Sequence, residues 1–370
     1  VIIGGGIAGC SVAYHLAKLG WKDIVLLERK KLTSGTTWHA AGLLGQGRSG
    51  PSAQKITAYS TNLYDNLEAE TGVSTGIKRN GSLYVAISEE RGEEYRRLGS
   101  SIRMNGLDAE VLSPEAAKKL YPLLNISDVT MALHVPSDGQ ADPANVALAL
   151  AKGARQQGAK IFENVKVTGI TITDGAVRGV TTDQGPIKAD YVVNAAGLWG
   201  RDVGLMAGVH VPLQACEHFY IVTEPIPDLP RNLPVMRCQE ESAYYKEDAG
   251  KILLGAFEPG AKPWAVDSIP DDFEFTTLPE DMDHFAPVLE AAANRLPILQ
   301  TAGIKIFFNG PESFTPDDRY YLGEAPNVRN FYTICGFNSV GIVTSGGAGM
   351  ALAEWMDKGY APFDLGDVDI

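Results

Sequence analysis

Residues 1–28 read VIIGGGIAGCSVAYHLAKLGWKDIVLLE, and the elements that they predict set the class of the fold. Residues 1–3 and residues 24–28 are short apolar runs of the kind that form buried strands. Between them, residues 7–19 place apolar side chains at helical spacing, and Gly20 is a typical helix stop. A strand, a helix and a second strand in this order predict a βαβ unit and therefore a parallel sheet.

A glycine motif, Gly4-x-Gly6-x-x-Gly9, fills the turn between the first strand and the helix. Gly4 suits a tight turn, Gly6 lets a pyrophosphate approach the backbone, and Gly9 lets the helix pack closely on the strand. The helix N-terminus supplies free N–H groups. Glu28, at the end of the second strand, is placed to accept hydrogen bonds from a ribose hydroxyl. The pattern predicts a dinucleotide site, but by itself it does not distinguish NAD from FAD.

The composition is that of an ordinary globular protein with an excess of acidic residues. The chain has 370 residues, of which 45 % are hydrophobic and 21 % are charged, and its formal net charge is −13. A chain of this length can hold one large or two medium cores. The negative charge argues against binding to nucleic acid or to an anionic membrane surface. No run of about 18 apolar residues predicts a membrane span.

The cysteines and the first residue carry two further expectations. Cys10, Cys216, Cys238 and Cys335 are far apart and form no Cys-x-x-Cys pair, so we expect neither a zinc site, nor any other metal, nor a disulfide framework. Because the sequence starts at Val1, inside an expected strand, we expect residues upstream of it. The bacterial cytoplasm and the mitochondrial matrix are both compatible locations.

The type of predicted secondary structure alternates along the chain and indicates two interleaved domains. Helices are expected over residues 52–72, 89–121 and 143–157, and three strands follow in quick succession within residues 160–182. Residues 212–310 instead alternate strands with proline-rich loops around one amphipathic helix. We predict a mixed α/β (α+β) fold with a Rossmann-type cofactor domain, interleaved with an antiparallel-sheet substrate domain. The expected bounds are 1–80, 140–211 and 311–370 for the cofactor domain, and 81–139 and 212–310 for the substrate domain.

The opening segment resembles that of the FAD-dependent oxidoreductases related to D-amino acid oxidase and sarcosine oxidase. That family has a three-strand crossover near the middle of the chain and a glycine-rich segment at the flavin, and residues 160–182 and 336–349 are the counterparts. The resemblance implies FAD as the cofactor. Besides the glycine motif and Glu28, it implies FAD contacts at Arg29, Thr36, residue 166 in Val165-Lys166-Val167, Ala196, Gly197, Trp199, Gly336, Asn338, Ser339, Gly341 and Ile342.

Residues 32–43 read LTSGTTWHAAGL and hold one imidazole, His39, among small residues that allow close approach to a ligand. On chemistry alone, His39 fits a ligand-binding base, a hydrogen-bonded structural histidine or an attachment point. The segment strongly resembles the corresponding loop of the sarcosine and dimethylglycine dehydrogenases. The resemblance implies that His39 carries FAD through a covalent bond to the flavin 8α carbon, an electrophile for which imidazole is a suitable nucleophile.

Two further segments resemble the catalytic strands of the same family. Amine oxidation requires a neutral amine, so a proton acceptor or a hydrogen-bonded polar pair beside the flavin assists it. Residues 217–223 (EHFYIVT) resemble the strand whose histidine faces the flavin, and residues 242–245 (SAYY) resemble the strand of its partner tyrosine. We therefore expect His218 and Tyr244 to be the catalytic pair. Tyr245 is the alternative, because strand alternation places only one of the two tyrosines on the inner face.

Other positions near these segments carry less specific expectations. Glu217 departs from the family, which usually has a neutral residue there, and it either alters the local charge or points outward. Arg48 matches an arginine of the sarcosine dehydrogenase pattern and is expected to bind the substrate carboxylate, although a solvated surface arginine fits equally. Residues 310–317 (GPESFTPD) are expected to form a wall of the substrate pocket. Residues 335–342 (CGFNSVGI) are expected to stabilise negative charge on the reduced flavin.

The resemblance covers nearly the whole chain and implies oxidative demethylation of a small N-methyl amino acid, sarcosine or dimethylglycine, by hydride transfer to FAD. The iminium product would yield formaldehyde or methylene-tetrahydrofolate. In this family a folate-binding domain normally follows, so tetrahydrofolate is expected only in a further domain of a longer protein. The electron acceptor would be oxygen or an electron-transferring flavoprotein.

Two other functions fit parts of the sequence. One is a non-catalytic FAD-binding regulatory protein that resembles the pyruvate dehydrogenase phosphatase regulatory subunit. Its relatives tend to lack a histidine at position 39, so His39 and His218 argue against it. The other is an NAD-dependent dehydrogenase, which rests on the dinucleotide motif alone.

Overall fold

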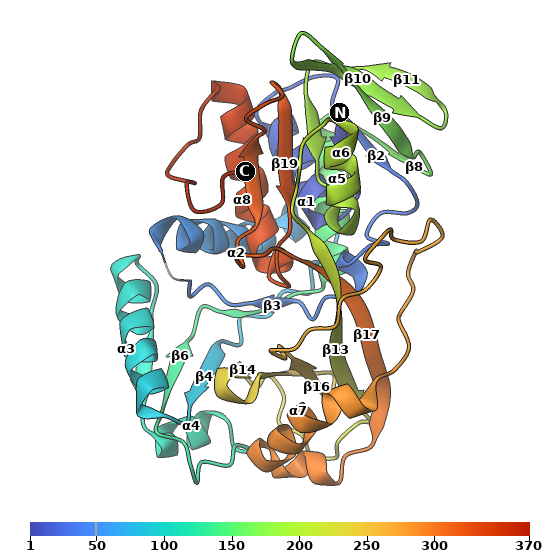
Figure 1. Cartoon of the computed structure of the whole chain (residues 1–370). Helices are drawn as coiled ribbons and strands as arrows, with labels where there is room; N and C mark the ends of the chain where they lie inside the picture. Colours follow the sequence, from blue (N-terminus) through green and yellow to red (C-terminus); the bar gives the residue numbers. More distant parts are fainter. Residues whose placement is uncertain (49) are drawn as a thin grey trace.

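The structure is a computed structural model that describes residues 1–48 and 50–370. Figure 1 shows two halves: the upper half surrounds a sheet that contains β2 and β19, and the lower half is built on a second sheet that contains β4, β13 and β17. Both chain ends lie in the upper half. The predicted mixed α/β fold, with a parallel and a mainly antiparallel sheet interleaved in sequence, is confirmed.

A six-stranded sheet forms the centre of the upper half, in the order β18-β19-β12-β1-β2-β8. Five of these strands are parallel, and only β18 is antiparallel to its neighbour. The chain leaves β1 in one direction for β2 and β8 and later pairs β12 on its other side, so the sheet has a switch point beside β1. The strands are, in sheet order, Tyr321–Glu324, Phe331–Cys335, Val192–Asn194, Ile2–Ile3, Val25–Glu28 and Lys160–Glu163.

Four helices cover one face of this sheet. α1 packs against α5 and α8, and α2 packs against α5 and α8 in turn. Their bounds are Ile7–Lys18 for α1, Pro51–Thr71 for α2, Pro143–Gln156 for α5 and Gly341–Lys358 for α8.

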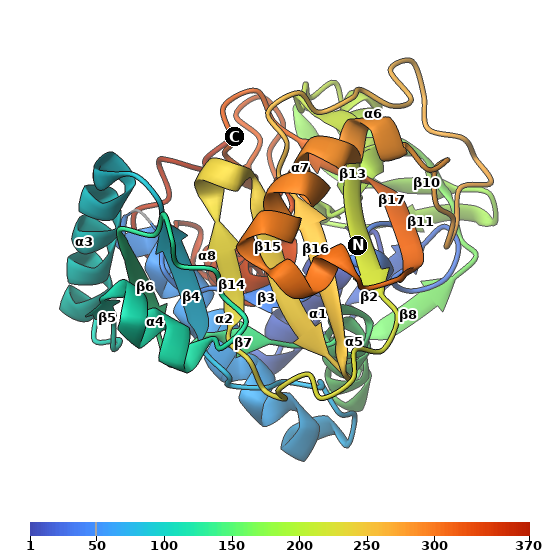
Figure 2. The same ribbon diagram turned by 90° about the horizontal axis from the view of Figure 1, so that it is seen from below.

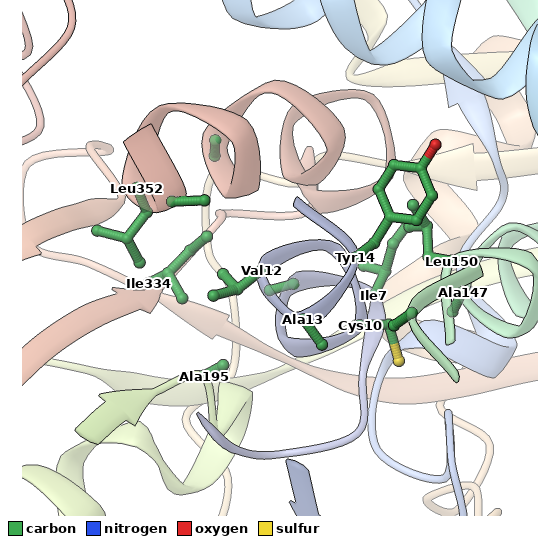
Figure 3. Packing of buried hydrophobic residues seen from close by; sticks show 14 of the residues in the cluster. Ile7, Cys10, Val12, Ala13, Tyr14, Ala147, Leu150, Ala195, Ile334 and Leu352 are labelled. Atoms are coloured by element: carbon green, nitrogen blue, oxygen red, sulfur yellow. The ribbon is translucent and has the colours of Figure 1, made fainter. Parts of the chain in front are cut away.

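The core under these helices is built from small and branched apolar residues. Figure 3 shows Val12 of α1 beside Ile334 of β19 and Leu352 of α8, and all three side chains are buried in one cluster. α8 comes close to α1 because its glycines leave room: a Cβ at Gly349 would lie 2.2 Å from Ser11 Oγ. The close packing holds the middle of α8 against α1.

A three-stranded sheet covers the opposite face, with β9 (Val167–Thr173), β10 (Ala176–Thr182) and β11 (Gly185–Lys188), and α6 (Gly200–Met206) lies beside it. The prediction that residues 160–182 form the three-strand crossover is wrong in its bounds. The first of those strands is β8, which pairs with β2 in the parallel sheet, and β11 is the third strand of the small sheet. Strand pairing across about 130 residues is not encoded in local propensity.

An eight-stranded sheet forms the lower half, in the order β17-β13-β16-β15-β14-β4-β6-β5. All neighbours are antiparallel except β14 and β4. In Figure 2, α7 (Met282–Arg295) lies across this sheet on the side away from the upper half. The strands are, in sheet order, Ile304–Phe314, Gln214–Thr223, Lys251–Ala256, Ala243–Asp248, Val235–Cys238, Ser82–Ala86, Met131–Val135 and Glu110–Leu112. A short pair, β3 (Leu43–Leu44) with β7 (Gly139–Gln140), runs between the two halves.

Three predicted elements differ from the structure. The helix expected over residues 89–121 is two helices, α3 (Glu89–Met104) and α4 (Pro114–Leu120), because Gly106 turns at φ +82° and the Ser113 side chain caps a new start. The glycine-rich segment expected over residues 336–349 is helical over much of its length, because α8 begins inside it at Gly341. The predicted boundary after residue 310 falls inside β17, so the division of domains stays a prediction.

Two observations concern the whole described chain. All four cysteines are buried and unbonded to one another. Over residues 1–48 and 50–370, no helix has both the length and the apolar character that crossing a membrane requires.

Candidate cofactor and active site

A cavity of about 560 Å³ opens at the carboxyl ends of β1, β2, β8, β12 and β19. Its walls are the loops that follow these strands, together with the first turns of α1 and α8. Parallel sheets bind ligands at this edge, beside the switch point. The cavity therefore lies where the glycine motif predicts a dinucleotide.

Most of the predicted cofactor residues line this cavity. They are Gly4, Gly6, Glu28, Arg29, Thr36, Lys166, Ala196, Gly197, Trp199, Gly336, Ser339, Gly341 and Ile342. Gly9 lies beneath the loop, and the Asn338 amide oxygen accepts a hydrogen bond from the Thr315 backbone N–H at 2.8 Å. Asn338 thus holds the glycine-rich loop to the end of β17. That any of these residues contacts a cofactor stays a prediction.

The glycine motif has the geometry that its three positions imply. Gly4 adopts φ +113°, and a Cβ at Gly9 would lie 2.0 Å from the Gly4 carbonyl oxygen, so only glycine fits both positions. The Glu28 carboxylate accepts hydrogen bonds from the backbone N–H groups of Gly5, at 2.7 Å, and Lys30, at 2.8 Å. Burial nevertheless raises the pKa of Glu28. Glu28 therefore supports the turn as well as lining the cavity.

Unpaired polar groups around the cavity fit a large polar ligand. Arg29 Nε and Trp199 Nε1 are buried without a hydrogen-bond partner in the described part of the chain, and both residues line the cavity. The Arg29 guanidinium lies over the Trp199 ring at 4.7 Å. Buried donors of this kind normally have a partner. These groups, the N-terminal end of α1 and the carboxylate of Glu28 suit the phosphates and ribose of FAD.

A second, smaller cavity of about 60 Å³ adjoins the first, and the two share the walls Ala40, Glu312, Ser339 and Ile342. Besides Ser339 and Ile342, four predicted site residues line it: His39, Arg48, His218 and Tyr244. His39 comes from the loop of residues 32–43, called the cofactor loop below, and Arg48 follows β3, while His218 and Tyr244 come from β13 and β15 of the eight-stranded sheet. The structure thus gathers at one place the histidine, tyrosine and arginine positions that were inferred separately.

The strand register explains how the sheet forms the floor of this cavity. Tyr84 of β4 pairs with Arg237 of β14, which pairs with Tyr244 of β15, which pairs with Gly255 of β16. Gly255 pairs in turn with Tyr220 of β13. Directly paired residues share a face, so these side chains form one row across the sheet. A Cβ at Gly255 would lie 1.9 Å from Tyr244 Cζ, so the missing side chain lets Tyr244 lie flat over this position.

Tyr245 and Glu217 face away from the cavity. Tyr245 is buried in the cluster that packs under α7. Glu217 alternates with His218 on β13, and its carboxylate accepts a hydrogen bond from the Asn309 side-chain amide at 2.8 Å. The departure from the family at Glu217 therefore points outward and does not charge the cavity.

Both cavity histidines are buried and electrically neutral. Burial lowers the pKa of His218 to about 4, and burial together with the nearby His218 lowers that of His39 to about 3. His218 Nε2 is 3.0 Å from Ser339 Oγ, a hydrogen-bonding distance that ties β13 to the start of α8. His39 Nε2 is buried without a partner in the described residues. His39 also needs Gly310 beside it, because a Cβ there would lie 2.8 Å from His39 Cε1.

The opposite part of the cavity is cationic. Arg48 and Arg237 both line it, and Arg237 also lies over the Phe257 ring at 5.1 Å. Burial is the main cause that lowers the pKa of Arg48, and Arg237 adds to it, while the buried Asp138 opposes the shift. Arg48 therefore is no freely solvated surface arginine.

Sequence reasoning missed Arg237, Tyr84 and Glu312 as cavity residues. Glu312 was part of a segment expected to form a pocket wall, but its side chain was not singled out. Arg237 and Tyr84 carried no local signal, because only the pairing of β14 with β4 and β15 aligns them with Tyr244.

Comparison with known proteins agrees with this geometry. Residues 1–355 match the FAD dependent oxidoreductase family, which confirms FAD as the cofactor in place of NAD. Human mitochondrial sarcosine dehydrogenase is 44 % identical over 100 % of this chain and 41 % of that protein. The mouse mitochondrial pyruvate dehydrogenase phosphatase regulatory subunit is 42 % identical over 100 % of this chain and 42 % of that protein. The chain thus spans about two fifths of the length of these curated relatives.

A solved structure supports the fold independently. The crystal structure of L-proline dehydrogenase from P. horikoshii superposes with a TM-score of 0.87 at 27 % identity, over 98 % of this chain and 93 % of that chain.

Proposed function

Because this chain belongs to the FAD dependent oxidoreductase family, we propose that it oxidises the N-methyl group of a small N-methyl amino acid, sarcosine or dimethylglycine. The observation that carries the proposal is the convergence of His39, His218, Tyr244 and Arg48 on one small cavity that shares walls with the cofactor cavity. Human sarcosine dehydrogenase is similar over the whole of this chain, which supports sarcosine as the first substrate to test.

In this proposal the large cavity binds FAD and the small cavity binds the substrate. The loops after β1, β2 and β12 hold the dinucleotide, with Glu28 at the ribose and the start of α1 at the pyrophosphate. FAD, when bound, supplies an acceptor for hydride from the carbon next to the amine nitrogen. The buried, neutral His218 and Tyr244 position the amine and exclude water from it.

Arg48 binds the substrate carboxylate. A guanidinium in this apolar surrounding gains from a bidentate carboxylate partner, and Arg237 adds positive charge at the same end. We expect Arg48→Gln to raise KM for sarcosine by about 100-fold while the absorbance of bound flavin stays unchanged. An unchanged KM would place the carboxylate elsewhere.

His39 would hold FAD covalently, through an imidazole nitrogen that replaces one hydrogen of the flavin 8α methyl group. Its support is an unpartnered, neutral Nε2 in a cavity wall next to the cofactor site, since a nucleophilic imidazole must be deprotonated. The test is acid denaturation of the purified protein: the yellow colour should stay with the polypeptide. In His39→Ala the flavin should separate from the precipitate, and free flavin from the wild type would contradict the bond.

The central experiment is anaerobic bleaching of the flavin. Sarcosine or dimethylglycine should bleach it, whereas glycine betaine and D-amino acids should not. If no N-methyl amino acid bleaches the flavin, the proposed function is wrong. His218→Ala should slow bleaching by about 100-fold or more and leave flavin content unchanged, while equal loss of both would indicate a structural role.

A second candidate is a non-catalytic FAD-binding regulatory protein, because the mouse pyruvate dehydrogenase phosphatase regulatory subunit is nearly as similar in sequence. The cavity with its two histidines favours an enzyme over this candidate. Binding of FAD without bleaching by any amine would favour the regulatory protein.

The product and the electron acceptor follow from the same proposal. The iminium released from the cavity yields formaldehyde by hydrolysis, or methylene-tetrahydrofolate where a folate-binding domain is part of the whole protein. Oxygen or an electron-transferring flavoprotein would reoxidise the flavin.

A further inference from the structure

Glu312 occupies a position between the two cavities that the proposed mechanism does not use. It lies on β17 and is one of the four residues that line both cavities. It pairs with Cys216 of β13, while His218, two residues further on, pairs with Gly310. Because residues two apart on a strand share a face, Glu312 lies on the same face of the sheet as His218. Its carboxyl group is therefore at the junction of the large cavity, called the cofactor cavity below, and the small cavity, called the substrate cavity after its proposed role.

The Glu312 carboxyl has no ion-pair or hydrogen-bond partner among residues 1–48 and 50–370. Burial alone raises its pKa to about 8. Unlike His39 Nε2, which is unpartnered among the described residues and fully enclosed by protein, the Glu312 oxygens are not fully enclosed. They therefore reach cavity space. A buried carboxylate is normally paired with a cation, and the described residues supply none to Glu312, so the adjoining cavity has room for one.

Arg237 is too far along the sheet to serve as that cation, and Arg48, which interacts with Arg237, makes no contribution to the raised pKa of Glu312. Three strands, β13, β16 and β15, separate β17 from β14, on which Arg237 lies. At about 4.8 Å per strand, the backbones of Glu312 and Arg237 are roughly 19 Å apart. The cavity thus has a carboxyl group at one end and arginines at the other. An amino acid in its zwitterionic form has the same arrangement of charges.

We propose that Glu312 binds the ammonium group of the substrate and accepts its proton, so that the amine becomes neutral before it is oxidised. This proposal rests on the proposed function. In this step one ammonium N–H bond breaks and one carboxyl O–H bond forms. The electron pair of the N–H bond remains on nitrogen as the lone pair, and the positive charge of the substrate and the negative charge of Glu312 disappear together.

His218 is a weaker candidate for the proton acceptor. Its Nε2 is engaged with Ser339 Oγ, and its pKa of about 4 makes the ring a poor base near neutral pH. The other titratable or charged groups that line the small cavity are His39 of the cofactor loop, Arg48 after β3, Tyr84 of β4, Tyr220 of β13, Arg237 of β14 and Tyr244 of β15. Burial raises the pKa values of the three tyrosines, so none of them is a base at neutral pH.

The first test measures recognition of positive charge without catalysis. Dimethylsulfonioacetate and 3-methylbutanoate have the same shape and the same carboxylate, but only the first has a permanent cation, and it has no proton to lose. Their dissociation constants are measured from the change in flavin absorbance of the holoprotein at about pH 9 and about pH 6. At pH 9 the wild type should bind the sulfonium compound about tenfold more tightly or better, and at pH 6 the preference should shrink as Glu312 is protonated.

Variants assign the preference to Glu312. Glu312→Gln should bind both compounds about equally at both pH values, and Glu312→Asp should restore part of the preference. The matched control is Glu217→Gln, the same substitution on the neighbouring strand but on the outer face, and it should behave as the wild type does. A wild-type preference near one at pH 9, or a preference that survives in Glu312→Gln, would overturn the proposal.

The second test measures the proton step. The rate of anaerobic flavin bleaching by sarcosine should level off above about pH 8 in the wild type. In Glu312→Gln it should keep rising, about tenfold per pH unit, because only the free amine in solution then reacts. Equal pH profiles would refute the proton transfer. If sarcosine and dimethylglycine fail to bleach even the wild type, the proposed function and the proton step fail together, whereas the binding preference still decides whether Glu312 holds a cation.

Discussion

The cofactor cavity and the substrate cavity differ in how the chain brings their residues together. The cofactor cavity collects residues from the ends of parallel strands and the loops after them: Gly4 directly follows β1, and Glu28 is the last residue of β2. The substrate cavity collects residues from the middle of strands in a mainly antiparallel sheet, where register aligns Arg237, Tyr244 and Gly255. The first kind of site depends on short local motifs, and the second depends on pairing between distant segments.

The difference predicts that substituting a glycine that packs beneath each cavity has a different consequence. The largest effect is expected for Gly9→Ala, because the new Cβ would lie 2.0 Å from the backbone oxygen of Gly4, which cannot move without opening the turn. We expect a loss of about 3 kcal/mol or more in stability and loss of bound FAD. Thermal unfolding and flavin absorbance measure both.

Gly169→Ala is the control for this experiment, because a Cβ at Gly169 of β9 would have its nearest neighbour at 3.8 Å. That variant should keep the melting temperature within a few degrees. A Gly9→Ala protein with normal flavin content would show that the glycine motif does not set the cofactor site.

Gly255→Ala should instead damage the substrate cavity and spare the cofactor. Its Cβ would lie 1.9 Å from Tyr244 Cζ, so the tyrosine ring must leave the cavity floor. We expect flavin content to be retained and the rate of flavin bleaching by sarcosine to fall by about tenfold or more. In a Tyr244→Ala background, Gly255→Ala should have little further effect on the rate, since the ring that it displaces is gone. Additive losses would mean that Gly255 acts through something other than Tyr244.

The same contrast explains what the sequence could predict. The βαβ opening, the cavity at its glycine motif and the inner positions of His218 and Tyr244 were predicted, the last two from resemblance to the sarcosine and dimethylglycine dehydrogenases. Arg237 could not be predicted, because its place depends on β14 pairing with β4, which is about 150 residues away in sequence. β8 was assigned to the wrong group of strands for the same reason. Local pattern indicates which face a side chain takes, but it does not indicate which strand lies next to it.

Removing the hydroxyl group of each of the two adjacent tyrosines in turn tests which of them faces the cavity, with a smaller expected effect on the bleaching rate. Tyr244→Phe removes a hydroxyl from the cavity floor, so the bleaching rate should fall by about tenfold with unchanged stability. Tyr245→Phe removes a buried hydroxyl that has no partner in the described residues, so stability should be unchanged or rise by about 1 kcal/mol, with a normal rate. The reverse pattern would exchange the inner and outer positions of the two residues.

The last prediction concerns the pH dependence of stability and comes from Glu312. Its pKa is raised to about 8 in the folded protein from an ordinary value of 4.5. Between these values the folded chain keeps a proton that the unfolded chain releases, so this group lowers the stability of the folded state as the pH rises. Glu312→Gln has no proton to release, and its melting temperature relative to wild type should rise between about pH 5 and about pH 9. The buried His39 and His218 titrate in the opposite sense, but they are present in both proteins, so their effect cancels in the difference.

Glu217→Gln, on the outer face, is the control, and its melting temperature relative to wild type should not change with pH. The same constant difference for Glu312→Gln would mean that the carboxyl is already paired or solvated in the holoprotein. The substrate cavity would then have no vacant acceptor for a proton.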